Sequence, residues 1–285
     1  MHKIQITECP RDAMQGIKEF IPTNQKISYL NALLKVGFEV LDFGSFVSPK
    51  AIPQLKDTAE VLGNLELDKT QTKLLAIVAN LRGAQDAAKH KEIKFQGFPF
   101  SVSETFQKRN TNKSIAESLE QIKEIRDIAH SADQELLVYL SMGFGNPYGD
   151  EWSPQIVLDW AGELSKAGIK SMALADTIGV SNPENIDFLF KTLIPGLNDV
   201  KFGAHLHTTP NTWREKVEAA FNAGCFRFDS AIKGYGGCPM AKDDLTGNMP
   251  TEKLLTFAQE KNLESSVNML RFETAVNEAL HTFPI

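Results

Sequence analysis

Short apolar segments rich in β-branched residues alternate with longer segments of helical period along most of this chain. Apolar runs of about four to eight residues that end at turn-forming residues are typical of buried strands. The pattern predicts eight such strands, at Lys3–Thr7, Phe38–Asp42, Leu74–Ala79, Glu92–Phe95, Leu136–Met142, Ser171–Leu174, Lys201–His207 and Phe226–Asp229.

The segments between the strands predict helices with recognisable ends. Ser114, Ser153 and Asn182 stand where an N-cap residue is expected, because their side chains can accept a hydrogen bond from a free backbone N–H. Glycines at 37, 168 and 224 fall just past predicted helix ends. The predicted helices include Asn24–Val36, Ser114–His130, Ser153–Ala167, Pro183–Leu193 and Thr212–Ala223, with the tail Thr251–Leu280 as additional helix.

Eight strand-then-helix units in about 250 residues predict an α/β fold, the (β/α)₈ TIM barrel, with additional C-terminal helices. A doubly wound open sheet is the alternative, which periodicity alone leaves open. No internal repeat, low-complexity segment or linker divides the sequence. We therefore expect one catalytic domain over residues 1–285, in which residues from about 250 to 285 form helices packed on the barrel.

Composition narrows the class of protein. The 285 residues are 42% hydrophobic and carry a formal net charge of −6, without a basic excess for binding nucleic acid. The first residues lack the apolar run of a signal peptide or a membrane span, so we expect a soluble, cytoplasmic protein with no membrane partner. Three scattered cysteines, none in a C-x-x-C pair, are expected to be free thiols, with Cys9 and Cys225 buried.

Polar residues gather where the predicted strands end. In a TIM barrel the active site lies at the C-terminal ends of the strands, so this clustering indicates catalysis. Taken alone, each residue is explained as well by helix capping or turn formation. Lys108 and Arg109, after the fourth strand, fit a solvated charge pair better than a contact with a cofactor phosphate. The strand-end residues are Asp12, Asp42, Ser45, Asn80, Asp176, Thr177, His205, His207 and the loop that carries Cys238.

A His-x-His pair is the sharpest of these features. Residues two apart in a strand point to the same side, so His205 and His207 project together while Leu206 faces the opposite layer. By themselves the two imidazoles are as typical of a core as of a metal site. Asp12 adds an oxygen ligand from the first strand, and together the three side chains suit a divalent ion such as Mg²⁺, Mn²⁺ or Zn²⁺.

Several motifs together resemble a known family. ITECPRDAMQ, SFVSPK, ADTIGVSNP, HLHTTPNT and GYGGCPMA, the last followed by Gly247 and Asn248, stand in the order found in 3-hydroxy-3-methylglutaryl-CoA lyases. These metal-dependent TIM-barrel lyases are related to isopropylmalate and homocitrate synthases, and the resemblance runs from about Ile4 to about Leu280. It implies cleavage of 3-hydroxy-3-methylglutaryl-CoA, or a closely related 3-hydroxyacyl-CoA, to acetyl-CoA and acetoacetate. It also implies a divalent metal cofactor, Mg²⁺ or Mn²⁺, and a homodimer.

The resemblance assigns roles to individual residues. The implied metal ligands are Asp12, His205, His207 and Asn248, and the implied catalytic residues are Arg11, Cys238, His205, Asp12 and Asp42. The implied substrate-binding residues are Arg11, Gln15, Lys18, Ser45, Asn80, Asn112, Asp176 and Thr177. In the expected reaction His205 or Asp12 accepts the hydroxyl proton and Arg11 stabilises the enolate oxygen of acetyl-CoA. Cys238, on a glycine-rich loop that closes over the pocket, then protonates the carbon.

The sequence also departs from the family. Asp42 replaces the usual glutamate, Thr208 follows the second histidine where an aspartate is usual, and the interval from Cys238 to Asn248 is one residue longer. These differences point to a divergent member with an altered substrate. Two alternatives stay open: a condensing synthase of the isopropylmalate or homocitrate type, and a non-catalytic barrel that binds metal or acyl-CoA. The cysteine loop and SFVSPK favour cleavage over condensation.

Overall fold

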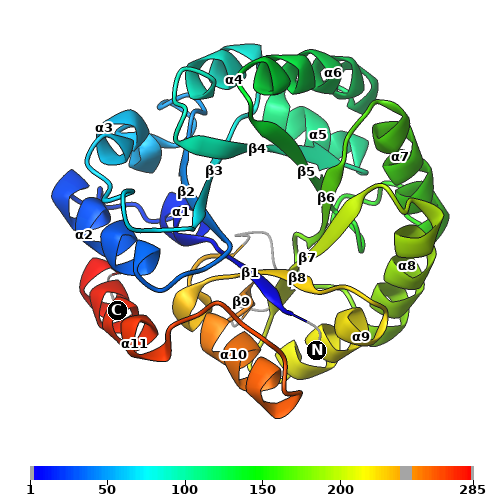
Figure 1. Cartoon of the computed structure of the whole chain (residues 1–285). Helices are drawn as coiled ribbons and strands as arrows, with labels where there is room; N and C mark the ends of the chain where they lie inside the picture. Colours follow the sequence, from blue (N-terminus) through cyan, green and yellow to red (C-terminus); the bar gives the residue numbers. More distant parts are fainter. Residues whose placement is uncertain (1–2, 238–245, 284–285) are drawn as a thin grey trace.

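The computed structural model describes residues 3–237 and 246–283, which form a ring of parallel strands surrounded by helices (Figure 1). Strand β1 pairs with both β2 and β8, and each remaining strand pairs with its neighbours in sequence, so the sheet closes on itself. The TIM-barrel prediction is confirmed and the open sheet is excluded. The barrel strands are β1 Gln5–Glu8, β2 Val40–Ser45, β3 Lys73–Ile77, β4 Ile93–Ser101, β5 Glu135–Ser141, β6 Ser171–Asp176, β7 Lys201–Thr208 and β8 Arg227–Ser230.

Strand β4 is longer than the sequence predicts. The prediction ends it at Phe95, whereas the strand continues through Gly97 and Pro99 to Ser101. A Cβ at Gly97 would lie 2.6 Å from Ile77 Cδ1 and 3.2 Å from Leu75 Cδ2, so the glycine leaves room for side chains of the neighbouring strand. Pro99 lies beyond the last β3–β4 pair, Ile77 with Gly97, where its missing N–H removes no bond to β3.

Helices connect successive strands and end much as predicted. Ser114, Ser153 and Asn182 each accept a hydrogen bond from the backbone N–H three residues on, which confirms the three predicted N-caps. The helices are α1 Pro10–Gln15, α2 Thr23–Leu34, α3 Thr58–Leu62, α4 Leu81–Ala87, α5 Glu104–Thr111, α6 Ile115–Ser131, α7 Pro154–Lys166, α8 Pro183–Gly196, α9 Trp213–Asn222, α10 Thr251–Glu260 and α11 Met269–Thr282, with 3₁₀ turns η1 Pro53–Leu55 and η2 Ile232–Gly234. No helix in the described part of the chain has both the length and the apolar composition needed to cross a membrane.

The predicted C-terminal tail is two helices. Helix α11 packs against α2 (Figure 1). Beside this contact the Phe272 ring meets the Phe38 ring edge-on, and the Phe283 ring meets the Tyr29 ring edge-on. Just before α10, a two-residue strand, β9 Gly247–Asn248, pairs antiparallel with the end of β7. The sequence does not predict β9, because two residues are too short to show a period.

An apolar cluster fills the middle of the barrel. It contains Leu75 and Ile77 of β3, Leu137 and Tyr139 of β5, and Ala173 of β6. Ile77 and Tyr139 border a cavity at the C-terminal ends of the strands, whereas Leu137 borders another cavity at the N-terminal ends. The cluster therefore separates the two mouths of the barrel.

Candidate active site

A cavity of about 450 Å³ opens at the C-terminal ends of the strands. This is the end at which TIM barrels carry their active sites. Polar lining comes from α1, the end of β6 and β7, and includes Arg11, Asp12, Gln15, Thr177, His205 and His207. Residues that are far apart in the sequence therefore line one cavity.

The Arg11 guanidinium is held in place from two sides. Its Nε lies 2.9 Å from Asp42 Oδ2, and its Nη1 lies 3.0 Å from Asp12 Oδ1 and 3.0 Å from Gln15 Oε1. The short helix α1 follows β1 directly and begins at Pro10, whose fixed φ suits a first helical turn. Arg11 therefore faces the cavity in one orientation, which suits it to meet a developing negative charge.

Asp42 lies behind Arg11 and is fully buried. Burial raises the pKa of its carboxyl to about 6, although the neighbouring Arg11 partly offsets this effect. Asp42 does not border the cavity, so in this structure it orients Arg11. Its direct participation in catalysis stays a prediction.

Asp12, His205 and His207 bring their potential ligand atoms within 4.8 Å of one another. The two histidine rings lie side by side, with centroids 5.3 Å apart, while Leu206 is buried on the other face of β7. The arrangement has the geometry that the His-x-His spacing predicts. Metal–ligand bonds of about 2 Å can therefore meet at one point between these three side chains.

The protonation state and the hydrogen bonding of His207 suit a ligand of a metal cation. Burial is the main cause that lowers its pKa to about 4, and the neighbouring His205 adds to the effect. The ring is therefore neutral near pH 7. A contact with the Thr177 backbone acts weakly to raise the pKa. Neither ring nitrogen has a hydrogen-bond partner of good geometry among the described residues. Buried polar atoms rarely lack a partner, and a metal ion would supply one.

Asp12 is ionised. Burial acts to raise its pKa, but Arg11 and the two histidines outweigh burial and lower the pKa to about 2. One carboxylate and two imidazoles form a donor set that suits a divalent ion with open positions.

Asn248 reaches the same cluster from β9, where it stands opposite His207. Its Nδ2 donates to Asp12 Oδ2 at 2.8 Å and to the Tyr235 carbonyl at 2.8 Å. Both amide hydrogens are thus used, which leaves the side-chain oxygen available as a ligand. The pairing of β9 with β7 is what brings this asparagine to the histidines.

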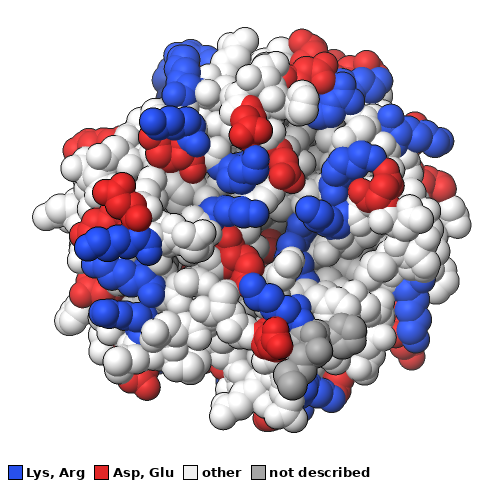
Figure 2. Space-filling view, in the orientation of Figure 1, with Lys and Arg blue, Asp and Glu red and all other residues white. Residues whose placement is uncertain are grey.

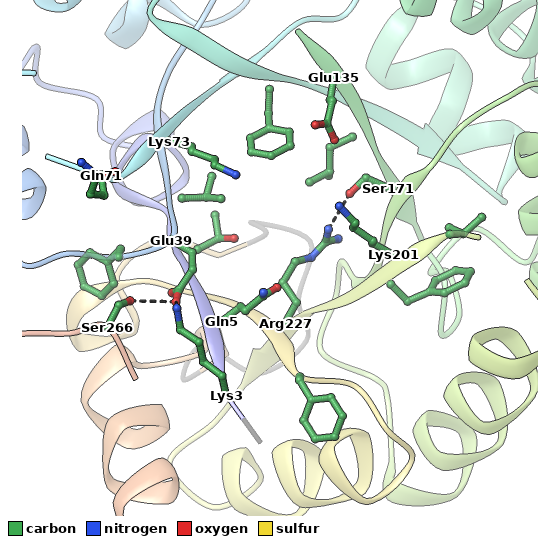
Figure 3. Close-up of a pocket in the computed structure, with 18 of the residues that line it drawn as sticks. Lys3, Gln5, Glu39, Gln71, Lys73, Glu135, Ser171, Lys201, Arg227 and Ser266 are labelled. Carbon is green, nitrogen blue, oxygen red and sulfur yellow. Dashed lines mark hydrogen bonds and ion pairs between the residues drawn. The ribbon is translucent and has the colours of Figure 1, made fainter. Parts of the chain in front are cut away.

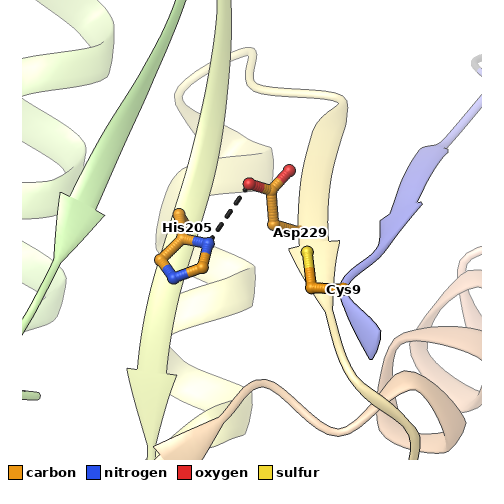
Figure 4. A group of neighbouring side chains, drawn as sticks. All are labelled: Cys9, His205 and Asp229. Atoms are coloured by element: carbon orange, nitrogen blue, oxygen red, sulfur yellow. Dashed lines mark hydrogen bonds and ion pairs between the residues drawn. The ribbon is translucent and has the colours of Figure 1, made fainter. Parts of the chain in front are cut away.

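A carboxylate on β8 supports His205 at one of its ring nitrogens. Asp229 Oδ2 lies 3.2 Å from His205 Nδ1, and Cys9 lies next to this pair (Figure 4). A carboxylate on one ring nitrogen fixes the ring orientation and directs the other nitrogen to a metal or substrate. Burial and the nearby Asp229 raise the pKa of Cys9, which keeps this thiol neutral. Asp229 is not among the predicted site residues, although it ends a predicted strand.

The glycines before Cys238 have a packing role. Gly236 has a φ of +84°, and a Cβ there would lie 2.8 Å from Ala13 Cα and 2.9 Å from the Asp12 carbonyl oxygen. Only glycine allows the chain to pass this close to α1. Gly237 borders the cavity. Cys238 itself lies outside the described residues, so its predicted role is not tested.

Three further predicted substrate-binding residues lie in or near α1 and β2. Gln15 borders the cavity and donates to Asp12 Oδ1 at 2.6 Å. Lys18 is exposed and does not border it. Ser45 is buried and donates to the Ile77 carbonyl at 3.3 Å. For Lys18 and Ser45, contact with substrate stays a prediction.

The other predicted pocket residues follow later strands. Thr177 borders the cavity, and its hydroxyl accepts the Met142 N–H at 2.8 Å. Asn80 caps α4, and Asn112 ends α5 with a φ of +57°; both are exposed. Asp176 is buried and forms an ion pair with Lys216 at 2.8 Å. These last three residues have structural partners and do not border the cavity, so their contact with substrate stays a prediction.

Two aromatic positions complete the lining. The Tyr139 hydroxyl is buried without a hydrogen-bond partner in the described part of the chain, and its ring meets His205 edge-on at 5.6 Å. Phe106 of α5 also borders the cavity, near Arg109, whose guanidinium stacks 4.7 Å from the Tyr148 ring centroid. Arg109 thus borders the cavity, while Lys108 pairs with Glu104 at 3.0 Å.

Comparison with known proteins agrees with this geometry. A protein-family model described as HMGL-like matches residues 3–278. This chain belongs to the HMGL-like family. Among curated members, the hydroxymethylglutaryl-CoA lyase of Bacillus subtilis is 31% identical over 96% of this chain and 91% of the relative. The mitochondrial hydroxymethylglutaryl-CoA lyase of Bos taurus is 32% identical over 94% of this chain and 82% of the relative.

Solved structures of HMG-CoA lyases superpose closely on this HMGL-like barrel. The crystal structure of the Bacillus subtilis enzyme matches with a TM-score of 0.92 at 30% identity, covering 99% of this chain and 94% of that one. An Acinetobacter baumannii HMG-CoA lyase in complex with coenzyme A and 3-methylmalate matches with a TM-score of 0.90 at 28% identity, covering 98% and 91%.

Proposed function

We propose that this protein is a divalent-metal-dependent carbon–carbon lyase that cleaves 3-hydroxy-3-methylglutaryl-CoA, or a close relative, to acetyl-CoA and acetoacetate. The observation that carries the proposal is the convergence of Asp12, His205 and His207 beside the fixed guanidinium of Arg11. Membership of the HMGL-like family and the names of the curated relatives support the reaction. The solved relative with bound coenzyme A supports an acyl-CoA substrate.

The proposed metal ligands are Asp12, His205, His207 and Asn248. A bound divalent cation, Mg²⁺ or Mn²⁺ in this proposal, would orient the substrate oxygens and lower the pKa of the substrate hydroxyl. The orphaned nitrogens of His207 and the hydrogen bond between Asn248 and Asp12 support this set.

In the proposed reaction the substrate hydroxyl loses its proton to Asp12, whose carboxylate has one oxygen for the metal and a second to accept the proton. Asp229, 3.2 Å from His205 Nδ1, orients the His205 ring so that its other nitrogen serves as a ligand. The hydroxyl-bearing carbon becomes a ketone as the C–C bond breaks. The electron pair of that bond stays with the carbon next to the thioester and is delocalised onto the thioester carbonyl oxygen, which forms an enolate. Arg11 faces that oxygen and stabilises it.

The proposed acid is Cys238, whose thiol donates its own proton to the enolate carbon and so forms acetyl-CoA. Once the products leave, the thiolate regains a proton and the base that took the hydroxyl proton gives it up. Gly237 borders the cavity, which supports delivery of the next residue to the substrate. Exclusion of water by the loop would protect the enolate from protonation by solvent.

The apolar part of the lining supports a substrate with an aliphatic group at C3. Val47, Ile52, Ile77 and Phe106 border the same cavity as the polar cluster. A Pseudomonas aeruginosa relative, 31% identical over 94% of this chain, is a 3-hydroxy-3-isohexenylglutaryl-CoA/hydroxymethylglutaryl-CoA lyase. A longer C3 chain is therefore a reasonable second substrate to assay.

The remaining proposals concern the whole molecule. We propose one catalytic domain, with helices from about residue 250 onward as part of it, a homodimeric state, a cytoplasmic location and no nucleic-acid or membrane partner. The formal net charge of −6 supports the last point.

The deciding experiment offers 3-hydroxy-3-methylglutaryl-CoA to the purified protein with Mg²⁺, with Mn²⁺ and with excess EDTA, and measures acetoacetate and acetyl-CoA. We expect metal-dependent release that falls by orders of magnitude in Cys238→Ala. Cys225→Ala is the matched control, since Cys225 is a buried thiol at the other end of β8. No turnover with either ion would reject the proposal. Condensation of acetyl-CoA with a 2-oxo acid, without cleavage, would instead support a synthase.

A further inference from the structure

The opposite mouth of the barrel holds a second cavity, of about 590 Å³, at the N-terminal ends of the strands. Most of its charged lining comes from residues at or near strand starts: Lys3, Glu39, Lys73, Glu135, Lys201 and Arg227 (Figure 3). Figure 2 shows Lys and Arg side chains around the hollow at the centre of this face, with Asp and Glu side chains among them.

The charges of this N-terminal cavity do not balance. Lys3 pairs with Glu39 at 2.8 Å. Of the other charged lining groups, three are cations (Lys73, Lys201 and Arg227) and one is a carboxylate (Glu135), which leaves a net charge of +2. Within residues 3–237 and 246–283, none of these three cations forms an ion pair with a carboxylate. A positive cavity on a chain of net charge −6 is a local feature that the overall composition does not explain.

The half-buried Arg227 is built into this cavity. Its side chain crosses from β8 over β7 to β6, where Nη1 donates to Ser171 Oγ at 2.7 Å and Nη2 donates to the Met172 carbonyl at 2.6 Å. Both acceptors are neutral, so they fix the guanidinium without cancelling its charge. Its Nε is buried and has no partner among the described atoms.

A glycine makes room for this crossing. A Cβ at position 203 would lie 2.1 Å from Arg227 Nε, so only Gly203 permits β7 to lie beneath the guanidinium. Lys201 stands two residues earlier on β7 and pairs with Ser171, the residue that holds Arg227. The register therefore brings a lysine and an anchored arginine to the same part of the rim.

We propose that the N-terminal mouth of the barrel binds a phosphate-bearing anion, held by Arg227, Lys201 and Lys73. Arginine and lysine are the side chains that proteins use for phosphate, and an arginine already fixed in orientation loses little entropy on binding. Gln5, Gln71 and Ser171 border the cavity and supply neutral polar groups. The site is separated from the active site by the apolar cluster in the barrel, and it does not depend on the proposed reaction.

The test measures binding of inorganic phosphate and of ADP to the metal-loaded enzyme by ³¹P NMR titration at constant ionic strength. Lys73→Gln/Lys201→Gln removes two exposed lysines at strand starts, so the fold is retained, which circular dichroism checks. We expect saturable phosphate binding that weakens at least tenfold in this double variant. If ADP binds more tightly than phosphate and loses the same factor, the ligand is a nucleotide; otherwise it is free phosphate.

The matched control is Lys123→Gln/Lys166→Gln, which makes the same charge change on outer helices, where each lysine pairs with a glutamate. The control should keep full affinity. The proposal fails if phosphate does not bind below about 100 mM, or if the control weakens binding as much as the double variant does. It also fails if binding persists in Lys73→Gln/Lys201→Gln and is lost in Arg109→Gln, because the anion then occupies the catalytic mouth.

Discussion

The buried Glu8 carboxyl predicts a pH dependence of the free energy of unfolding, and the structure gives its approximate size. This side chain points away from the active-site cavity and is fully buried, where Oε1 accepts the Ile232 N–H at 2.8 Å and Oε2 accepts the Thr251 hydroxyl at 2.6 Å. Burial raises its pKa from an ordinary 4.5 to about 8, because the two hydrogen bonds only partly compensate for the lost solvation. A carboxyl in β1 thus ties together η2 and the start of α10.

The sign of the effect follows from proton linkage. Between pH 4.5 and about 8 the folded protein keeps the proton on Glu8, whereas the unfolded chain has lost it. The free energy of unfolding therefore falls as pH rises through this window. At about 1.4 kcal/mol per unit of pKa, the contribution of Glu8 is on the order of 5 kcal/mol.

Glu8→Gln mimics the protonated side chain at every pH, since the amide can still accept the Ile232 N–H and donate to the Thr251 hydroxyl. We expect the variant and the parent to be similarly stable near pH 5, and the variant to be more stable by several kcal/mol near pH 8.5. Urea unfolding from pH 5 to 8.5 in EDTA measures this difference without a contribution from bound metal. Glu60→Gln, at an exposed glutamate, is the control. Parallel pH profiles for parent and Glu8→Gln would refute the reasoning.

Three further substitutions test other contacts. Lys216→Met should cost about 3–5 kcal/mol in urea unfolding, because it leaves the buried Asp176 carboxylate without its ion pair, and adding Asp176→Asn should recover part of the loss. Asp229→Asn should lower Mn²⁺ affinity about 10–100-fold in calorimetry, because His205 loses its carboxylate partner; unchanged affinity would contradict the orienting role. Gly203→Ala should destabilise the fold by about 1–3 kcal/mol through its clash with a guanidinium, and an unchanged melting temperature would count against that packing.

Local patterns in the sequence are sufficient to locate the eight barrel strands and to give the geometry of the metal site. The two-residue strand period fixes that His205 and His207 share a face, and buried β-branched runs mark all eight barrel strands. Asp12 joins them because the C-terminal ends of parallel strands meet at one end of a barrel. Such features depend only on residues close together in sequence and on the closure of the sheet.

Other features depend on contacts that no local pattern encodes. The ion pair of Asp176 with Lys216 and the support of His205 by Asp229 join residues 40 and 24 positions apart. Strand β9 exists only through its pairing with β7. The error in β4 has the opposite cause, because Gly97 and Pro99 are locally unfavourable for a strand and are accommodated by their neighbours.

The apolar cluster that includes Leu75, Leu137, Tyr139 and Ala173 lies across the barrel and separates its two rims. Charged residues of the two rims, such as Lys201 and Arg11, line different cavities on opposite sides of this cluster, so the effects of substituting them on folding should add. A designer can therefore alter the acyl specificity of one rim and the charge of the opposite rim in parallel, and combine the results without screening every pair.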